Sequence, residues 1–371
     1  MSRAGSVSGA GFAGSYAEGD VRFLLQALTL QPVADLLDKE RLIQSGARHY
    51  SEMISPETLP GTAYLALFHA AVQANAGRMA ADLLRLARRI RAARPGEVTL
   101  VSLARAGTPV GVLLRRLLAD LYAVDAPHYS ISVIRDRGVD AAALDHVLAR
   151  HAAHSLVFVD GWTAKGAISQ ELQRSLAHYN AARGTQLAPD LFVLCDLAGQ
   201  AFASGSADDY LIPSALLNAT VSGLISRTLL NAQIAPGQFH GCLFHADWHA
   251  QDLSRWFIDR LMAELARHKT AWLAEPLPDI DRDAPRQRMQ RLLQTLAQHH
   301  HVTDPGFIKP GLGEATRALL RRTPRLLLLR DPDAPEVRHL LQLAQQRALP
   351  VQVDATLGLH AVALLRRLAD G

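Results

Sequence analysis

Short apolar runs alternate with helical patterns along most of this chain. In each run a few consecutive positions are apolar and often β-branched or aromatic, which indicates a buried strand. Between the runs, apolar residues recur every three or four positions, as on one face of a helix. This alternation predicts an α/β fold built on a parallel sheet. The expected strands are 98–103, 128–134, 156–159, 191–196, 325–330 and 351–353.

The segment before the first expected strand is predicted to be a helical extension. Apolar residues from Phe23 to Leu37 suggest a helix interrupted at Pro32, and residues 62–94 suggest one or two amphipathic helices. Residues 1–19 are rich in Gly, Ser and Ala and lack the apolar core of a secretory signal. We therefore expect them to form a flexible tail.

Composition places the chain among ordinary globular proteins. Its 371 residues suggest about two domains, and 49% of them are hydrophobic. A net charge of +4 permits phosphate-bearing ligands or RNA without requiring them. The two cysteines, Cys195 and Cys242, provide no disulfide framework, and no apolar run approaches the ~20 residues of a membrane helix. These features predict a cytoplasmic protein and leave its oligomeric state open.

A loop of small residues follows the expected strand 156–159. It begins with the carboxylate of Asp160 and contains Gly161, Thr163, Lys165 and Gly166 before a helical pattern starts. Ligands of open α/β sheets gather at the carboxyl ends of strands, and a loop that opens a helix there offers N–H groups to a phosphate. The loop is therefore a candidate phosphate site, with Asp160 placed to bind sugar hydroxyls.

A second loop of the same kind follows the expected strand 98–103. Here Arg105, Ala106, Gly107 and Thr108 stand directly before a helix. Since both loops follow strands of one predicted sheet, we expect them to face a common anion pocket.

Two further polar segments are candidates for the same pocket. Arg135 and Arg137 follow the expected strand 128–134 and could close on an anion. Asp209 precedes residues 210–228, which mix apolar residues with many hydroxyls and could cover a substrate.

The carboxyl-terminal part reads as a separate small α/β unit. The proline-rich segment 276–285 is the clearest linker. The predicted division is a tail at 1–19, a large domain at 20–272, a linker and helix at 273–307, and a small domain at 308–371. In the small domain we expect helices at 315–322, 335–348 and 359–368.

The small domain resembles the Pelota-type and L7Ae-type RNA-binding fold. The glycine-rich turn that ends in Glu314 lies where that fold grips RNA, so the resemblance implies a possible RNA partner. Arg317, Arg321, Arg322 and Arg325 would supply a basic face.

The large domain resembles the type I phosphoribosyltransferases. Asp160 takes the place of the first acid of their ribose-phosphate loop, while Gly161 replaces the second acid and Lys165 replaces a threonine. Blocks at 102–109, 134–138 and 158–162 look like one bacterial family, the phosphoribosyltransferase-like proteins with a Pelota-type tail found among tellurite-resistance and stress genes. Part of that family is labelled cysteine protease StiP.

This resemblance implies a transferase that binds phosphoribosyl pyrophosphate with Mg²⁺ and passes phosphoribose to a base or related acceptor. Asp160, Arg105 and Asp209 would be catalytic, and Asp160 would also hold the metal. The ligand-binding residues would be Ala106, Gly107, Thr108, Arg135, Arg137, Gly161, Thr163, Lys165 and Gly166.

Two other functions stay open. The first is a cysteine protease that uses Cys242 or Cys195; Cys242 is the better candidate, because His240, His245 and His249 lie close to it in sequence. The second is a non-catalytic sensor of nucleotides or RNA, since Gly161 stands where an acid is expected.

Overall fold

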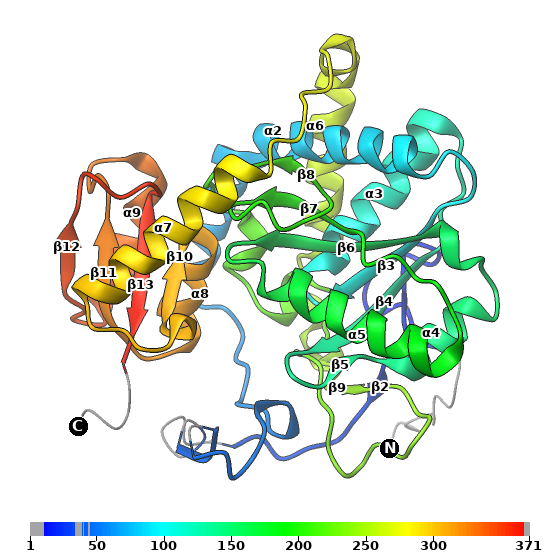
Figure 1. Ribbon diagram of the computed structural model, residues 1–371, viewed down its shortest axis with the longest axis horizontal. Coiled ribbons are helices and arrows are strands. Elements are labelled where there is room, and N and C mark those ends of the chain that lie inside the picture. The colour runs from blue at the N-terminus through cyan, green and yellow to red at the C-terminus, as the bar shows by residue number, and fades with distance from the viewer. Residues whose placement is uncertain (1–10, 34–38, 40, 44, 367–371) are drawn as a thin grey trace.

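The computed structural model describes residues 11–33, 39, 41–43 and 45–366, which form a large domain and a smaller carboxyl-terminal domain (Figure 1). The large domain is built on a seven-stranded sheet whose main strands are all parallel. The short strand β5 (Gly138–Val139) pairs antiparallel with β4 at one end. The main strands, in spatial order, are β1 (Arg22–Phe23), β4 (His128–Ile134), β3 (Thr99–Ala104), β6 (Leu156–Thr163), β7 (Leu191–Asp196) and β8 (Ala203–Ser206). The expected α/β fold with a parallel sheet is confirmed.

Helices cover both faces of this sheet. One face carries α2 (Thr62–Ala93), α3 (Gly107–Tyr122) and α6 (Ser254–Ala274). The other face carries α4 (Ala141–Leu148) and α5 (Ala167–Arg183). The strands are apolar on both sides because helices bury both sides, as is typical of parallel sheets.

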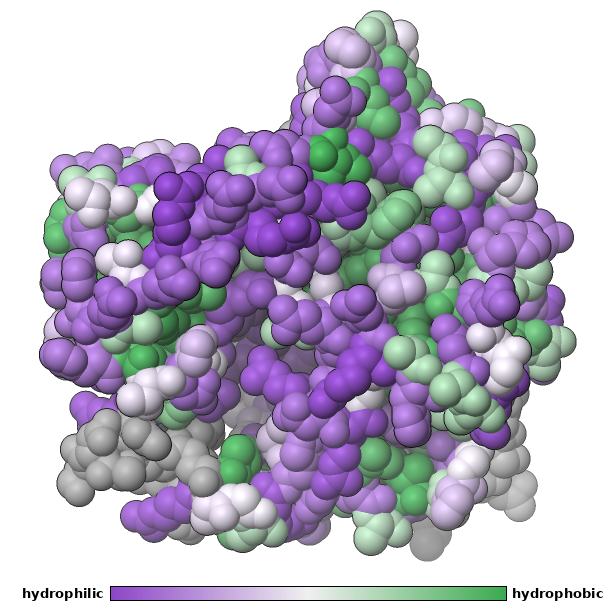
Figure 2. All heavy atoms as spheres, in the orientation of Figure 1, coloured by the Kyte–Doolittle hydropathy of each residue, from purple (hydrophilic) through white to green (hydrophobic). Residues whose placement is uncertain are grey.

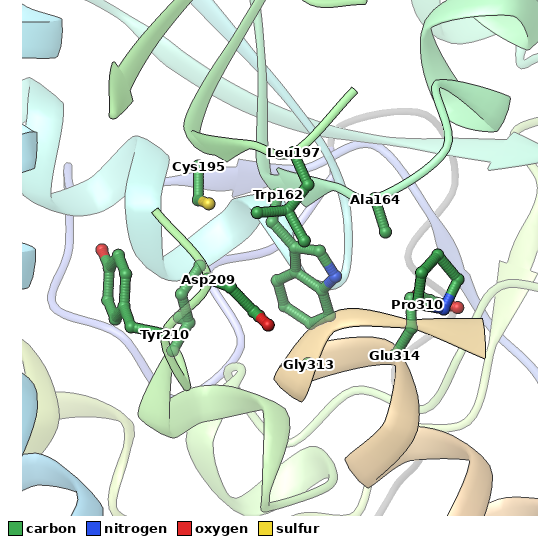
Figure 3. Close-up of a pocket in the computed structure, with 10 residues that line it drawn as sticks. Trp162, Ala164, Cys195, Leu197, Asp209, Tyr210, Pro310, Gly313 and Glu314 are labelled. Atoms are coloured by element: carbon green, nitrogen blue, oxygen red, sulfur yellow. The ribbon is translucent and has the colours of Figure 1, made fainter. Parts of the chain in front are cut away.

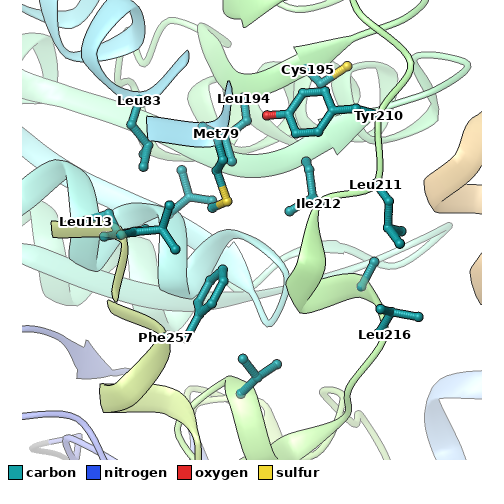
Figure 4. Close-up of a cluster of buried hydrophobic side chains, with 14 of the residues drawn as sticks. Met79, Leu83, Leu113, Leu194, Cys195, Tyr210, Leu211, Ile212, Leu216 and Phe257 are labelled. Atoms are coloured by element: carbon teal, nitrogen blue, oxygen red, sulfur yellow. The ribbon is translucent and has the colours of Figure 1, made fainter. Parts of the chain in front are cut away.

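The larger core lies between the sheet and the first group of helices. Figure 4 shows Met79 and Leu83 of α2 with Leu113 of α3, Leu194 of β7 and Phe257 of α6. These side chains are fully buried. Residues 210–216, part of the segment expected to cover a substrate, supply further apolar side chains to this core. The apolar residues of that segment are therefore explained by packing.

The small domain has a four-stranded sheet flanked by helices. Its strand order is β10 (Ile308–Pro310), β13 (Ala361–Leu365), β11 (Pro324–Leu329) and β12 (Val351–Val353). Its helices are α7 (Asp283–His299), α8 (Gly311–Arg321) and α9 (Arg338–Gln346). Leu296 of α7 packs with Ile308 and Leu364, so α7 belongs structurally to this domain.

Short elements complete the chain. A two-stranded parallel sheet joins β2 (Gln26–Ala27) to β9 (Gly241–Cys242). The short 3-10 helices are η1 (Tyr50–Glu52), η2 (Ala153–Ser155), η3 (Pro213–Ala215), η4 (Ala219–Val221), η5 (Ala246–Gln251), η6 (Pro305–Phe307) and η7 (Pro335–Val337). Within the described ranges, no helix has the length and apolar character needed to span a bilayer.

Two expected helices are wrong. The segment expected as a helix at 359–368 contains strand β13, whose five residues are all buried in the middle of the small sheet. The segment that begins at Phe23 forms β1 and β2 instead of a helix, because Phe23, Leu24 and Leu25 are all buried and β1 pairs with β4. In both places tertiary pairing overrides a helical pattern. Residues 34–38 lie outside the described part of the chain.

The expected tail divides at Gly11. Residues 1–10 are outside the described residues, whereas Phe12 bridges to Phe23 and the Tyr16 side chain is buried against the large domain. The helical extension is represented by α2, which forms one continuous helix.

Candidate functional site

The two loops expected to face each other lie side by side. β3 and β6 are neighbouring parallel strands, so Arg105 and Asp160 stand at the same edge of the sheet. The backbones are close: a Cβ atom added to Gly107 would lie 2.4 Å from the Val159 carbonyl oxygen. A Cβ atom on Gly161 would lie 3.4 Å from the Ala106 carbonyl oxygen. Because Gly107 and Gly161 lack a Cβ atom, the loop after β3 can lie close to the end of β6.

The Arg105 guanidinium is engaged by protein groups. Its Nη2 lies 2.9 Å from Glu57 Oε1, and its Nη1 donates to the Ile225 carbonyl at 2.8 Å. The Arg105 charge opposes the effect of burial on Glu57, and the pKa of Glu57 is lowered overall. Arg105 therefore joins the loop after β3 to the segments that contain Glu57 and Ile225.

Asp160 stands at the junction of the two domains. Its Oδ1 accepts a hydrogen bond from the Gly161 N–H at 2.8 Å. Burial raises the pKa of Asp160 to about 7, and the charges of Arg317 and Glu314 in the small domain act on it in opposite directions. An acid with this pKa exchanges protons near neutral pH.

The magnesium expected at Asp160 stays a prediction. Across the described residues, no group of three or more His, Cys, Asp or Glu side chains could hold a metal ion. Since Arg317 is close to Asp160, a bare divalent cation fits this position poorly, and no chemical step is assigned to one.

Lys165, expected to hold a phosphate, reaches the small domain instead. Its Nζ donates to the carbonyl oxygens of Pro305 at 2.6 Å and Ile308 at 2.8 Å. Burial, with the nearby charge of Lys309, lowers the pKa of Lys165 to about 8. The expected loop begins later than predicted, because Asp160, Gly161 and Thr163 belong to β6, which pairs with β7 as far as Thr163. The Thr163 hydroxyl accepts from the Gly166 N–H at 3.0 Å, so this N–H is satisfied within the chain segment itself.

Two other expected ligand residues, Arg137 and Thr108, are held elsewhere, whereas the charge of Arg135 acts on Lys165 and Glu314 at the junction. Arg137 Nη2 pairs with Glu52 Oε1 at 2.8 Å, and the backbone N–H of Arg135 donates to the Tyr50 hydroxyl at 2.8 Å. The Thr108 hydroxyl is fully buried, 2.8 Å from the Ser130 hydroxyl.

Asp209 connects the two domains. Its Oδ1 accepts from the Leu312 N–H at 2.7 Å, and its Oδ2 accepts from the His360 N–H at 2.9 Å. Burial raises the pKa of Asp209, and the two N–H groups act against this rise. One carboxylate thus binds two backbone positions of the small domain.

The glycine-rich turn of the small domain is part of the same junction. A Cβ atom on Gly311 would lie 2.5 Å from the Leu197 side chain, and one on Gly313 would lie 3.2 Å from the Trp162 ring. The Arg317 guanidinium lies over that ring, 5.5 Å from its centre. Because the large domain covers this turn, RNA cannot reach it in the present arrangement.

A small cavity lies at the centre of the junction (Figure 3). Trp162, Cys195, Asp209 and Tyr210 of the large domain face Gly313 and Glu314 across it. Its volume is about 10 Å³, which is the room of about one water molecule. A peptide or nucleotide cannot enter it while the domains are docked.

Cys195 borders this cavity and is protonated there. Its Sγ lies 2.7 Å from the Asp208 carbonyl oxygen, to which the thiol donates, and the side chain is 3% exposed. Burial raises the pKa of the thiol, and the nearby carboxylates, led by Asp209, raise it further. In the described part of the chain, Asp208 is the one hydrogen-bond partner of this thiol.

Cys242, the better cysteine candidate from sequence, is sealed in the core. It is 0% exposed, it lies in β9, and burial raises the pKa of its thiol to about 12. The neighbouring His240 ring is 2.8 Å from the Ser132 hydroxyl, and the His245 ring stacks on Trp248. The preference for Cys242 is therefore unsupported by the geometry.

Sequence reasoning missed Glu57 and Trp162 as members of the junction. Glu57 lies in an irregular segment without hydrophobic period, and its position beside Arg105 depends on tertiary folding. Trp162 carried one usable signal, because a tryptophan among small residues at the end of a strand needs a partner surface.

Comparisons with known proteins identify the family. The family model described as tellurite-like stress resistance cysteine protease StiP matches residues 14–262. The model described as PELOTA RNA binding domain matches residues 287–367. A protein named cysteine protease StiP, from Acinetobacter baylyi (strain ATCC 33305 / BD413 / ADP1), is 42% identical over 375 residues, which cover 97% of this chain and 96% of that protein.

These matches overturn the expected transferase. The family model and the Acinetobacter protein both carry the description of a cysteine protease, so the phosphoribosyltransferase activity expected from the loops is wrong. The loop geometry agrees, since Arg105 and Lys165 are bound to protein groups. The expected Pelota-type domain and the tellurite and stress association are confirmed. The chain belongs to the StiP family of tellurite-like stress resistance cysteine proteases and carries a PELOTA-type domain at its carboxyl end.

Proposed function

We propose that this protein is a cysteine protease whose nucleophile is Cys195. The family description and the name of the Acinetobacter relative support the activity. The position of Cys195 carries the choice of residue: it stands at the carboxyl end of β7 and borders the junction cavity, whereas Cys242 is sealed in the core.

The docked arrangement is an inactive form of this enzyme. A cysteine protease needs a thiolate, which attacks the peptide carbonyl carbon to form a thioester and releases an amine; water then hydrolyses the thioester. Here the thiol keeps its proton and donates it to the Asp208 carbonyl. The cavity also excludes a peptide chain, so the small domain must move away before substrate can bind.

Separation of the domains would change Cys195 in two ways. Water would reach the thiol, and the part of its pKa rise that comes from burial would fall. The Asp209 carboxylate would lose the Leu312 and His360 N–H groups and become available as a proton acceptor beside the thiol. The Asp209 residue expected to be catalytic thus keeps a proposed role, in a different reaction.

The test compares the unmodified protein, Cys195→Ala and Cys242→Ala in a peptidase assay and in labelling with an irreversible thiol-directed probe. We expect Cys195→Ala to abolish both signals and Cys242→Ala to keep them, because only Cys195 reaches the junction. Loss of activity in Cys242→Ala with retained activity in Cys195→Ala would show that the other cysteine is the nucleophile. Absence of peptidase activity under conditions in which Cys195 is labelled would refute the protease.

The small domain favours a second function, RNA binding. Residues 287–367 match the model of an RNA-binding domain, and the chain has 39 Lys and Arg against 35 Asp and Glu. A measurement of binding to a short single-stranded RNA at low salt tests this proposal, and no binding there would refute it.

A further inference from the structure

Arginine side chains from both domains meet at the junction beside α8. Arg317 and Arg321 lie one turn apart on α8, so their side chains leave the same face of that helix. The Arg317 guanidinium lies over the Trp162 ring, and Arg321 Nη2 donates to the Leu217 carbonyl oxygen at 3.0 Å. Figure 1 shows α8 at the side of the small domain that faces the large domain, and Figure 2 shows a hollowed, mostly hydrophilic surface between the two domains.

A short segment of the large domain connects Arg321 to a second arginine. Its Leu217 carbonyl accepts from Arg321, and two residues further on the Ala219 N–H donates to Glu57 Oε2 at 3.3 Å. The same Glu57 oxygen accepts from Arg105 Nη1 at 3.0 Å. Arg105 and Arg321 are therefore close together, and the charge of Arg105 acts on Arg321.

Arg227 completes this group from the side of the large domain. The charges of Arg105 and Glu57 act on it, and its Nη2 donates to the backbone carbonyl oxygens of Tyr50 and Met53. We name the group the arginine cluster; its members are Arg105, Arg227, Arg317 and Arg321.

The guanidinium groups of the cluster outnumber its acids. Two carboxylates, those of Glu57 and Glu314, act on Arg321. Glu57 already pairs with Arg105 at 2.9 Å, and Glu314 pairs with Arg317 at 3.4 Å. Among the described residues, the one hydrogen-bond acceptor of Arg321 is a backbone carbonyl, which leaves its charge without an acid of its own.

The surrounding groups do not remove this excess of charge. A third acid, Asp160, has a pKa of about 7 and is only partly charged at neutral pH. Lys309 and Arg135 add two positive charges, while Lys165 and Asp304 balance each other. The cluster and its surroundings therefore carry a net positive charge.

The cluster also offers donors that lack acceptors. Arg227 Nη1 and the Nε2 atom of His245, a neighbour of Arg105, are buried without a hydrogen-bond partner in the described part of the chain. Arg321 is open to solvent, although partial loss of water around its guanidinium group, with the charges of Arg105 and Arg317, lowers its pKa to about 9. An anion with several oxygen acceptors matches both the charge and the free donors of this place.

We propose that the arginine cluster binds a small oxyanion, with Arg321 as its principal contact. The ligand class follows from the donors, because a guanidinium fork directs two N–H groups at two oxygens of one anion. The site differs from the loop expected to hold a phosphate, in which the Lys165 ammonium and the Gly166 N–H are already bound to protein groups.

A bound oxyanion would hold the two domains together. Arg317 and Arg321 belong to the small domain, whereas Arg105 and Arg227 belong to the large domain. A ligand that contacts both sides binds only the docked form and stabilises it. If Cys195 is the nucleophile, which rests on the proposed function, the oxyanion keeps that thiol covered.

Titration calorimetry at constant ionic strength tests the binding. The probes are phosphate, sulfate and tellurite, three small oxyanions of different shape. Tellurite is titrated into the full chain with Cys195→Ala and Cys242→Ala, because thiols reduce it. We expect saturable binding of at least one probe at one site per chain.

Substitutions of Arg321 test the place of the site. Arg321→Gln should lower the affinity by about ten- to a hundredfold, because it removes the charge and the fork. Arg321→Lys keeps the charge without the fork and should lower the affinity less. If Arg321→Gln does not fold, Arg321→Lys decides, and an unchanged affinity in that variant would overturn the proposal.

Arg325→Gln is the matched control. Like Arg321, Arg325 donates to one backbone carbonyl, that of His300 at 2.7 Å, but it lies in β11 beside the end of α7. Its loss removes one positive charge from the small domain outside the cluster, so the affinity for the oxyanion should stay the same.

Hydrogen exchange shows whether the anion lies between the domains. The Leu312 and His360 N–H groups are held by Asp209 only while the domains are docked. An oxyanion at about ten times its dissociation constant should slow their exchange about tenfold. The effect should disappear in Arg321→Gln.

The outcomes separate the site from its ligand and from the proposed functions. The proposal is overturned if none of the three oxyanions binds, or if Arg321→Gln binds as tightly as the unmodified protein. Binding that leaves the exchange of Leu312 and His360 unchanged would place the anion outside the junction and overturn it as well. Binding of one probe alone identifies the ligand, and equal binding of all three supports a general oxyanion site. These measurements need neither peptidase activity nor RNA, so the failure of either proposed function is a separate result.

Discussion

The hydrogen bonds of Asp209 predict that one substitution exposes Cys195. Asp209→Ala removes both acceptors that hold the Leu312 and His360 N–H groups of the small domain. The remaining contacts, such as those from Lys165 to Pro305 and Ile308, stay in place. The variant should therefore loosen the junction, which is still held by these contacts and by the apolar cluster that Leu312 and Leu319 of α8 share with the large domain.

The magnitude follows from the two hydrogen bonds. A hydrogen bond to a charged group contributes about 1.5–3 kcal/mol, so the pair contributes about 3–6 kcal/mol. Burial raises the pKa of Asp209 although both N–H groups act to lower it. The loss of hydration of the buried carboxylate therefore offsets part of the free energy that the two hydrogen bonds contribute. We therefore take the lower end, about 3 kcal/mol, which corresponds to roughly a hundredfold larger population of the open form.

The assay is the rate at which a thiol reagent labels each cysteine, read by peptide mass spectrometry. Labelling of Cys195 should accelerate about a hundredfold in the variant, in line with the larger open population. Cys242 serves as an internal reference, because it is buried away from the junction. Asp208→Ala is the matched control: its exposed carboxylate pairs with Arg78, and its loss leaves the junction intact.

The pH dependence separates opening from a change in thiol pKa. The Asp209 charge helps to raise the pKa of Cys195, so its removal alone would move the labelling profile to lower pH. Opening raises the rate at every pH. The reasoning is refuted if Cys195 labelling in Asp209→Ala equals that of the unmodified protein, or if both cysteines accelerate together, which would indicate global unfolding.

Three further predictions concern the stability of the fold. Burial lowers the pKa values of His128 and His339 to about 4, so both stay neutral in the folded protein. Their contribution to the free energy of unfolding, about 3 kcal/mol each, is present above pH 6.5 and is lost as pH falls towards 4. Denaturant titrations at pH 7 and pH 5 should show this loss, and a smaller one in His128→Gln; equal stability at both pH values would contradict it. Gly107→Ala should destabilise the protein by about 1–3 kcal/mol, because the new Cβ meets backbone atoms, whereas Gly96→Ala, with open space around it, should not. Phe257→Ala should cost about 3–5 kcal/mol by leaving a cavity in the main core, and a cost under about 1 kcal/mol would show that the core collapses around it.

The sequence predicted the central strands well because their signal is local. Residues 98–103 are mostly apolar or β-branched, residues 191–195 are continuously apolar, and these segments form most of β3 and β7. The segment at 361–365 was misassigned because Ala361-Val-Ala-Leu-Leu365 suits a buried helix as well as a central strand. The segment forms a strand because it pairs with β10 and β11, and these tertiary contacts cannot be predicted from the residues of the segment alone.

The candidate site was predicted only in part, for the same physical reason. The proximity of Arg105 and Asp160 follows from two neighbouring parallel strands, so the pattern was sufficient. The partners of these loops are far away in sequence: Lys165 binds Pro305 and Ile308. A lysine in a glycine-containing loop is consistent with a phosphate ligand or a docked domain, and only the tertiary structure distinguishes the two.

The junction at Asp209 also limits how this protein can be divided for study. A fragment that stops in the proline-rich linker would leave the Trp162 ring and the Leu197 side chain without the glycines that cover them. The same cut would leave the separated small domain with bare Leu312 and His360 N–H groups. Separately expressed halves should therefore be prone to self-association, and mixing them should restore a one-to-one complex.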